Sequence, residues 1–135
     1  EDAGVRAGEV MAYRVWRRER GGTLHSMVNL QEWPPDGIMR GDPVGDCGTP
    51  GYGCLGVHAF KTADQVEAQY GLGVGYGRLA FGRVALWGVI IEHEDGYRAE
   101  FAKIIAIDEM TGCWPGSESW VLRKLRRHYG LTGHE

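Results

Sequence analysis

The residues best placed to do chemistry lie in one stretch, GVIIEHEDGYRAEFAKIIAI, from Gly88 to Ile107. Arg98 and Glu100 are two positions apart, so on a strand both side chains point to the same face. A carboxylate flanked by apolar residues needs a partner, and Arg98 is the nearest partner for Glu100. These two residues, with His93 before the turn, predict either a recognition or acid/base pair on a sheet surface or a hairpin tip with structural ion pairs.

Two registers are open for this hairpin. A two-residue turn at Asp95-Gly96 places His93 opposite Arg98. A three-residue loop with a glycine bulge slips the pairing by one residue and places Glu92 opposite Arg98. In either register Arg98 and Glu100 share a face, so the expected pair does not depend on the turn.

The cysteines and two of the histidines contain the ligand atoms that zinc prefers. The set is Cys47, Cys54, Cys113, His25 and His58. Its C-x6-C-x3-H spacing is wider than the knuckles typical of structural zinc sites, so we expect buried or free thiols, no metal and no cofactor. Cys54 with His58 suggests a nucleophile and a base, but four residues along one strand leave them too far apart to hydrogen-bond directly.

Aromatic residues are numerous for 135 residues, with five Trp and six Tyr. We expect most of them in the core, and we expect Trp33 and Trp114, which stand beside prolines in loops, to line a groove. Trp87 lies on the expected hairpin and is a further stacking candidate. Aromatic side chains together with Arg suit a nucleobase or single-stranded nucleic acid, although the same residues also build a hydrophobic pocket.

Hydrophobic periodicity and turn residues predict the elements that position these side chains. We expect strands at 11–19, 23–30, 54–60, 84–91 and 97–107, loops at 38–52 and 71–77, a helix at 62–70 and a second helix from Ser117 to Gly130. Thr62 and Gln65 form a capping-box signature. This order predicts an α+β fold, a mostly antiparallel twisted sheet or small open barrel with two helices, of which PUA-like and SH3-like barrels are examples.

Bulk composition narrows the class of protein. The chain has 135 residues, a mass of 14.9 kDa and a formal net charge of −3, so nothing draws it as a whole toward nucleic acid. We expect a flexible arm at 1–10, one α+β domain at 11–135, no membrane partner and a cytoplasmic location. Basic residues gather near both ends, and the basic C-terminal helix is a possible surface for a protein partner.

Three segments together resemble a group of small uncharacterised bacterial proteins. The segments are W-P-P-D-G (Trp33 to Gly37), G-C-L-G-V-H-A-F-K (Gly53 to Lys61) and W-G-V-I-I-E-H-E-D-G-Y-R-A-E (Trp87 to Glu100). Members of that group carry a W-P-P-G turn, a C-x-C-G-I-Y-A-F-K-like segment and a G-Y-R-A-E hairpin. Leu55 departs from the group, where Cys is common. The resemblance implies a single domain and no particular activity, and it directs attention to Trp33, His58, Arg98 and Glu100.

The leading hypothesis from the sequence is a non-catalytic recognition module that binds a nucleotide, nucleobase or similar polar ligand, or nucleic acid, on a sheet face. Arg98 and Glu100 would orient the ligand, and Trp33 or Trp87 would stack on it, with His58 and His93 nearby. One alternative is a hydrolase or transferase in which one of these histidines is the base and acts with Glu100 or Cys54. The other is a protein-interaction or assembly domain.

Overall fold

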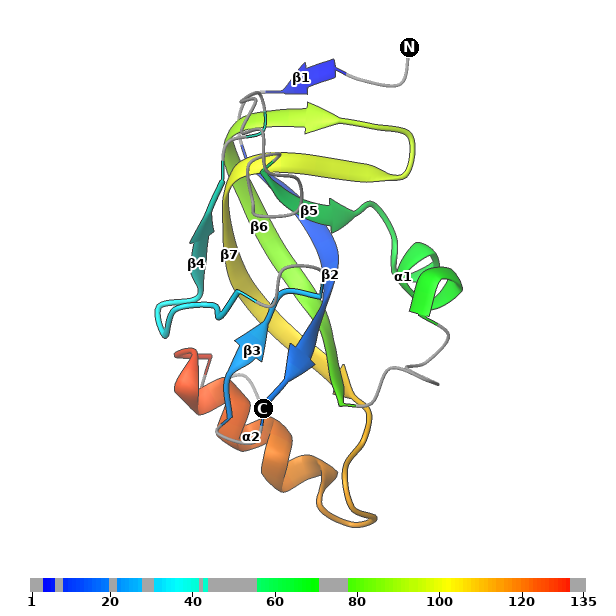
Figure 1. Ribbon diagram of the computed structural model, residues 1–135, viewed down its shortest axis with the longest axis vertical. Helices are drawn as coiled ribbons and strands as arrows, with labels where there is room; N and C mark the ends of the chain where they lie inside the picture. Colours follow the sequence, from blue (N-terminus) through cyan, green and yellow to red (C-terminus); the bar gives the residue numbers. More distant parts are fainter. Residues whose placement is uncertain are drawn as a thin grey trace.

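The computed structural model describes residues 4–6, 9–19, 22–27, 31–41, 43, 56–70 and 78–131. Within these residues seven strands form one antiparallel sheet, and two helices accompany it (Figure 1), which confirms the predicted α+β class. The strands are β1 (Gly4–Arg6), β2 (Val10–Arg18), β3 (Leu24–His25), β4 (Ile38–Arg40), β5 (Val57–Phe60), β6 (Leu79–Glu92) and β7 (Gly96–Met110). The helices are α1 (Ala63–Tyr70) and α2 (Glu118–His128).

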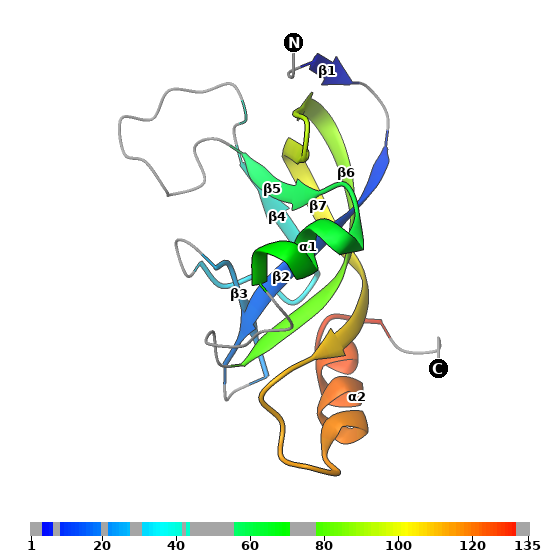
Figure 2. The ribbon, with the colours of Figure 1, turned by 90° about the vertical axis from the view of Figure 1, so that its right-hand side faces the viewer.

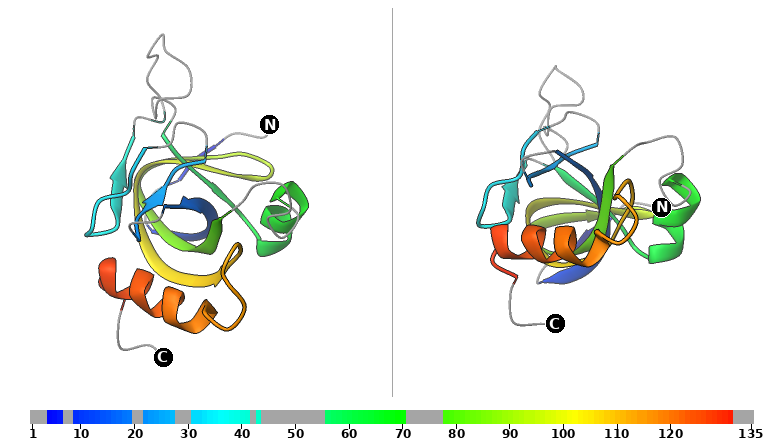
Figure 3. Two further views of the ribbon diagram at one scale, coloured as in Figure 1. Left: turned by 60° about the horizontal axis from the view of Figure 1, so that its bottom comes forward. Right: turned by 90° about the horizontal axis from the view of Figure 1, so that it is seen from below.

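The sheet curls strongly but is not a regular barrel. Its order is β1-β6-β2-β5-β7-β4, β3 pairs with β2, and β6 also pairs with β7. The circuit β6-β2-β5-β7 therefore returns to β6, yet β2 and β5 meet only at the pair Tyr13–Phe60. Figure 3 shows the long strands bending around a common interior, with α1 and α2 at different sides of the sheet. Whether the sheet belongs to the PUA-like or SH3-like kind remains a prediction.

The bend is located in the β6–β7 hairpin. Its register shifts three times, between Phe81 and Gly82, between Arg83 and Val84, and between Trp87 and Ile90. At Gly82 a Cβ atom would lie 2.1 Å from the backbone oxygen of Ala106, a distance that no side chain tolerates. Bulges increase the local twist of a strand, and glycine allows the close approach of a second backbone.

The inner face of the curled sheet holds the main core. Trp16 and Trp33, both fully buried, pack edge to face at its centre, with ring centroids 5.5 Å apart. The prediction that Trp33 lines a groove is therefore wrong. Its backbone N–H donates to the oxygen of Leu24 (2.9 Å) and its indole Nε1 donates to Ser26 Oγ (3.1 Å), and both contacts direct the ring inward.

Helix α2 closes one end of this core through Leu125 and Tyr129, which are almost fully buried. The Tyr129 hydroxyl accepts from the backbone N–H of Leu24 (2.8 Å) and donates to the backbone oxygen of Trp33 (3.2 Å). Burial raises the pKa of this hydroxyl, so it keeps the proton that it donates. The helix ends at His128, and Gly130, which has a φ of 73°, completes a Schellman motif beyond it, so the predicted stop at this glycine is confirmed.

Helix α1 covers a second, smaller apolar cluster on the outer face. Val66 of the helix packs there with Val15 and Leu79. The capping box is confirmed, because Gln65 N–H donates to Thr62 Oγ1 (3.2 Å) and Thr62 N–H donates to Gln65 Oε1 (3.0 Å). Figure 2 shows α1 lying across the sheet beside β2 and β5.

Several predicted boundaries differ from the structure. Ile38–Arg40, expected in a loop, forms β4, because Gly37 at a φ of 76° accepts from the Ile104 N–H and directs the chain along β7. Part of the expected N-terminal arm forms β1, which extends the sheet at β6. The strand expected at 23–30 is reduced to β3, and residues 28–30, 54–55 and 71–77 lie outside the described residues.

The described helices contain no segment that is long and apolar enough to cross a membrane.

The substitution Tyr129→Phe tests the link between α2 and the core. Removing the hydroxyl leaves a buried N–H and a buried carbonyl without this partner, so we expect a loss of about 1–3 kcal/mol in the free energy of unfolding. Urea denaturation measures the loss. Tyr97→Phe is the matched control, because the Tyr97 hydroxyl makes no hydrogen bond within the described residues. Equal losses in both variants would show that the Tyr129 bonds contribute nothing specific.

Candidate functional site

The turn of the β6–β7 hairpin is wider than either predicted form. Glu92 pairs with Tyr97 and Ile91 pairs with Arg98, so both predicted registers are wrong. The His93 N–H donates to the oxygen of Gly96 (2.8 Å) and closes a four-residue loop between the paired residues. This one backbone hydrogen bond sets a register that the Asp-Gly pair alone does not specify.

Three of the predicted site residues nevertheless meet at this end of the sheet, and we call them the hairpin cluster: His58, His93 and Arg98. Arg98 Nε donates to His93 Nε2 (2.8 Å), and Arg98 pairs with His58 of β5 across the sheet. Partial desolvation lowers the pKa of His58, whose side chain is nonetheless exposed, and the neighbouring Arg14, Arg98 and His93 lower it further. Arg98 thus gives the cluster its positive charge, and His58 favours its neutral form.

Glu100 does not join this cluster. The β-bulge at Trp87–Ile90 leaves Gly88 and Val89 opposite Glu100, and Gly88 has a φ of 79°. Glu100 Oε1 accepts from the Val89 N–H (3.2 Å), and within the described residues its carboxylate forms no ion pair with Arg98. The expected Arg98–Glu100 pair is therefore not formed, because the bulge supplies the carboxylate with a different partner.

The two predicted stacking residues lie apart from the hairpin cluster. Trp87 stacks on Phe101, with ring centroids 5.4 Å apart and an interplanar angle of 13°, and Arg40 lies over the Phe101 ring. Trp33 lies in the core under the guanidinium of Arg14. The histidine–glutamate contact of the predicted hydrolase is also not made, because His93 bonds to Arg98 and Glu100 bonds to Val89.

A second candidate site lies at the opposite end of the sheet, where β2, β6 and β7 approach α2 (Figure 1). It is a depression of about 240 Å³, which we call the α2 hollow. Its charged and aromatic lining residues are Arg18, Glu19, Arg78, Lys124, Trp114 and Trp120, and Cys113 also lines it. Of these, the sequence predicted only Trp114 as a groove residue.

Backbone pairing holds the two arginines of this hollow next to each other. The Arg18 N–H donates to the oxygen of Arg78 (2.9 Å). The Arg18 guanidinium bonds to the backbone oxygens of Leu79 and Thr111 and lies 3.5 Å from Cys113 Sγ. Burial lowers the pKa of Arg18, Cys113 acts against this shift, and Arg78 adds to it through repulsion. Two like charges therefore share one partly desolvated hollow.

Aromatic surface borders these charges. Trp114 is 84% exposed and Trp120 is 57% exposed, which is unusual for the largest apolar side chain. Lys124 Nζ lies 5.3 Å from the centroid of the Trp120 ring, within cation–π distance. No carboxylate forms an ion pair with Arg18, Arg78 or Lys124 in the part of the chain that the structure describes. The hollow can accept an anion that also carries a flat ring.

Metal chemistry gains no support from the described residues. Among them no group of three or more His, Cys, Asp or Glu side chains is placed to hold an ion, and Cys113 is a free thiol. Cys47 and Cys54 of the predicted zinc set lie outside the described residues.

Comparison of the chain with protein-family models, with curated proteins and with solved structures gives no match. The resemblance noted from the sequence remains a prediction.

The hairpin cluster has a pH dependence that can be measured. Because the folded-state pKa of His58 lies below its unfolded value of about 6.5, the unfolded chain binds more protons below that pH. His58 thus favours the folded state fully above about pH 6.5, and this contribution is lost as the pH falls toward the folded pKa. We expect the unfolding free energy of the native chain to decrease more than that of His58→Gln from about pH 7.5 to about pH 5.

Denaturation at each pH gives this difference, and NMR titration of the His58 ring checks its cause. Arg98→Gln removes the positive charge of Arg98 from the surroundings of His58, so the ring should titrate at a higher pH in that variant. Parallel stability curves for the native chain and His58→Gln would contradict the assignment.

Proposed function

We propose that this chain is a non-catalytic recognition module that binds a nucleotide or a similar anionic ligand with a flat ring in the α2 hollow. The observation that carries the proposal is the arrangement of Arg18, Arg78 and Lys124 around one depression that is bordered by Trp114 and Trp120. This is the ligand class that the sequence suggested, at a different place on the sheet.

The charges favour a phosphate. Arginine presents a planar fork that matches phosphate geometry and binds it through two parallel hydrogen bonds. Arg78 would supply this fork, because Arg18 Nε and Nη2 already donate to backbone oxygens. An anion between Arg18 and Arg78 would also relieve the repulsion between their guanidinium groups. The hydrogen bonds from Arg18 to Leu79 and Thr111 fix its position before any ligand arrives, which reduces the entropy lost on binding.

The tryptophans favour a ring. Stacking of a base on an aromatic side chain contributes about 1–3 kcal/mol and tolerates any base, because every base has a π-face. Trp114 comes from the turn before α2 and Trp120 from α2 itself, and both present exposed aromatic surface at the hollow. A hollow of about 240 Å³ is small and holds part of a nucleotide, with the remainder in solvent.

Calorimetric titration with a panel of nucleoside monophosphates and free nucleosides tests the proposal. We expect the monophosphates to bind more tightly than the nucleosides, and we expect the affinity to fall as salt is added. Arg78→Gln should weaken binding by about tenfold or more, since a charge-assisted contact is worth about 1.5–3 kcal/mol. Trp114→Ala should weaken the binding of monophosphates and of nucleosides to the same extent, since stacking does not involve the phosphate.

Arg123→Gln is the matched control, because Arg123 lies exposed on α2 and does not line the hollow. Alkylation of Cys113, followed by peptide mass spectrometry, gives a second measurement, and bound ligand should slow it. Equal binding by Arg78→Gln and Arg123→Gln would exclude the α2 hollow as the site. A self-associating chain that binds no nucleotide would favour the protein-interaction alternative.

A further inference from the structure

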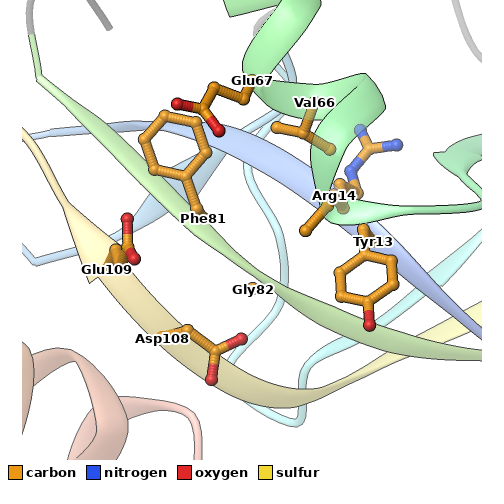
Figure 4. Close-up of a pocket in the computed structure, with 9 residues that line it drawn as sticks. Tyr13, Arg14, Val66, Glu67, Phe81, Gly82, Asp108 and Glu109 are labelled. Atoms are coloured by element: carbon orange, nitrogen blue, oxygen red, sulfur yellow. The ribbon is translucent and has the colours of Figure 1, made fainter. Parts of the chain in front are cut away.

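A second depression lies on the outer face of the sheet under α1, and it differs from the α2 hollow in charge. It encloses about 150 Å³, and we call it the α1 hollow. Figure 4 shows the rings of Tyr13 and Phe81 and the side chain of Val66 around it, with Gly82 between the two rings. These residues come from β2, β6 and α1, so the hollow lies where the helix meets the sheet.

Helix α1 is short and packs on the sheet through Val66, and its Gln65 bonds to Asp95 of the β6–β7 turn. The helix has eight residues, and Val66 is its buried residue among those with described side chains. Gly82 lies between the rings of Tyr13 and Phe81 and adds no side chain to the lining (Figure 4). An apolar cavity of about 150 Å³ holds a molecule the size of benzene.

Carboxylates surround the apolar walls of this hollow. Glu67 comes from α1, and Asp108 and Glu109 come from β7 (Figure 4). Asp108 accepts two hydrogen bonds from Arg83 (3.0 and 2.9 Å), and this contact raises the pKa of the Arg83 guanidinium. Glu67 and Glu109 form no ion pair within the described residues. Two carboxylates thus remain to receive a positive charge.

Arg14 also lines the hollow but forms no ion pair with Glu67 or Glu109, two of the described residues. Its guanidinium donates to the backbone oxygen of His58 and to Ser26 Oγ (3.1 Å), and it lies 5.0 Å from the centroid of the Trp33 ring. These partners belong to β5 and to the inner core, so the charged end of Arg14 is occupied away from the two glutamates.

We propose that the α1 hollow binds a primary alkylammonium group. The ammonium would lie between Glu67 and Glu109, and its apolar stem would contact Val66 and Phe81. Aromatic faces attract cations, so Tyr13 and Phe81 add to the carboxylates instead of competing with them. The volume limits the occupant to a stem of about four or five carbons, which corresponds to a small free amine or to a lysine side chain of a partner.

The probe is n-butylammonium, with n-butanol as a neutral ligand of similar shape and butyrate as an anion. We expect n-butylammonium to shift the backbone NMR signals of α1 and of β7 near Asp108 at millimolar concentration. n-Butanol should bind at least fivefold more weakly, and butyrate should not bind. Equal binding of the amine and the alcohol would overturn the proposal.

The glutamates provide the matched variants. Glu67→Gln and Glu109→Gln should each lower the affinity for n-butylammonium by about fivefold or more, since each substitution removes a charge and keeps the shape of the side chain. Glu94→Gln is the control, because Glu94 is an exposed glutamate that does not line the α1 hollow, and this variant should bind n-butylammonium as the native chain does. Unchanged affinity in both Glu67→Gln and Glu109→Gln would contradict the assignment of the charge.

Two further arms distinguish the source of the amine. A lysine-containing peptide that binds more tightly than n-butylammonium would identify a partner side chain as the occupant, whereas weaker binding by the peptide would identify a free amine. Both results support an alkylammonium site. Nucleotide binding at the α2 hollow involves none of these residues, so an experiment can contradict either proposal without affecting the other.

Discussion

The close approach of β6 and β7 at Gly82 is the constraint on which the rest of the structure depends. A backbone oxygen occupies the space that a side chain at this position would need, so the two strands can bend together there. The bend allows β2 to pair with β6 along most of its length and to touch β5 at one residue pair. The same bend creates an enclosed inner face for Trp16 and Trp33 and an outer face for α1.

Charged side chains are distributed unevenly over the surface of this sheet and its two helices. Cationic side chains gather in the α2 hollow and in the hairpin cluster, whereas carboxylates gather around the α1 hollow. The net charge of −3 conceals this separation, because it sums regions of opposite sign. A ligand approaching the surface responds to the local potential within about 10 Å, so separate regions can select ligands of opposite charge.

The sequence predicted local features well and distant contacts poorly. The capping box of α1, the end of α2 at Gly130 and both strands of the long hairpin follow from short patterns that depend on neighbouring residues. The hairpin register does not, because the bulge at Gly88 and the hydrogen bond of His93 decide it. The sequence did not predict the α2 hollow, because its two arginines are far apart in the chain. Arg18 is 61 residues from Leu79, the residue that follows Arg78, and only the folded sheet brings the two arginines together.

The hydroxyl of Tyr129 joins the last helix to segments near the start of the chain, with separations of 105 and 96 residues. Contacts of such long range cannot form while a ribosome still holds the C-terminal helix in its exit tunnel. The backbone groups of Leu24 and Trp33 therefore cannot bond to the Tyr129 hydroxyl until nearly the whole domain has emerged from the ribosome. These two hydrogen bonds therefore form late, and the N-terminal strands gain no stability from them before α2 is available.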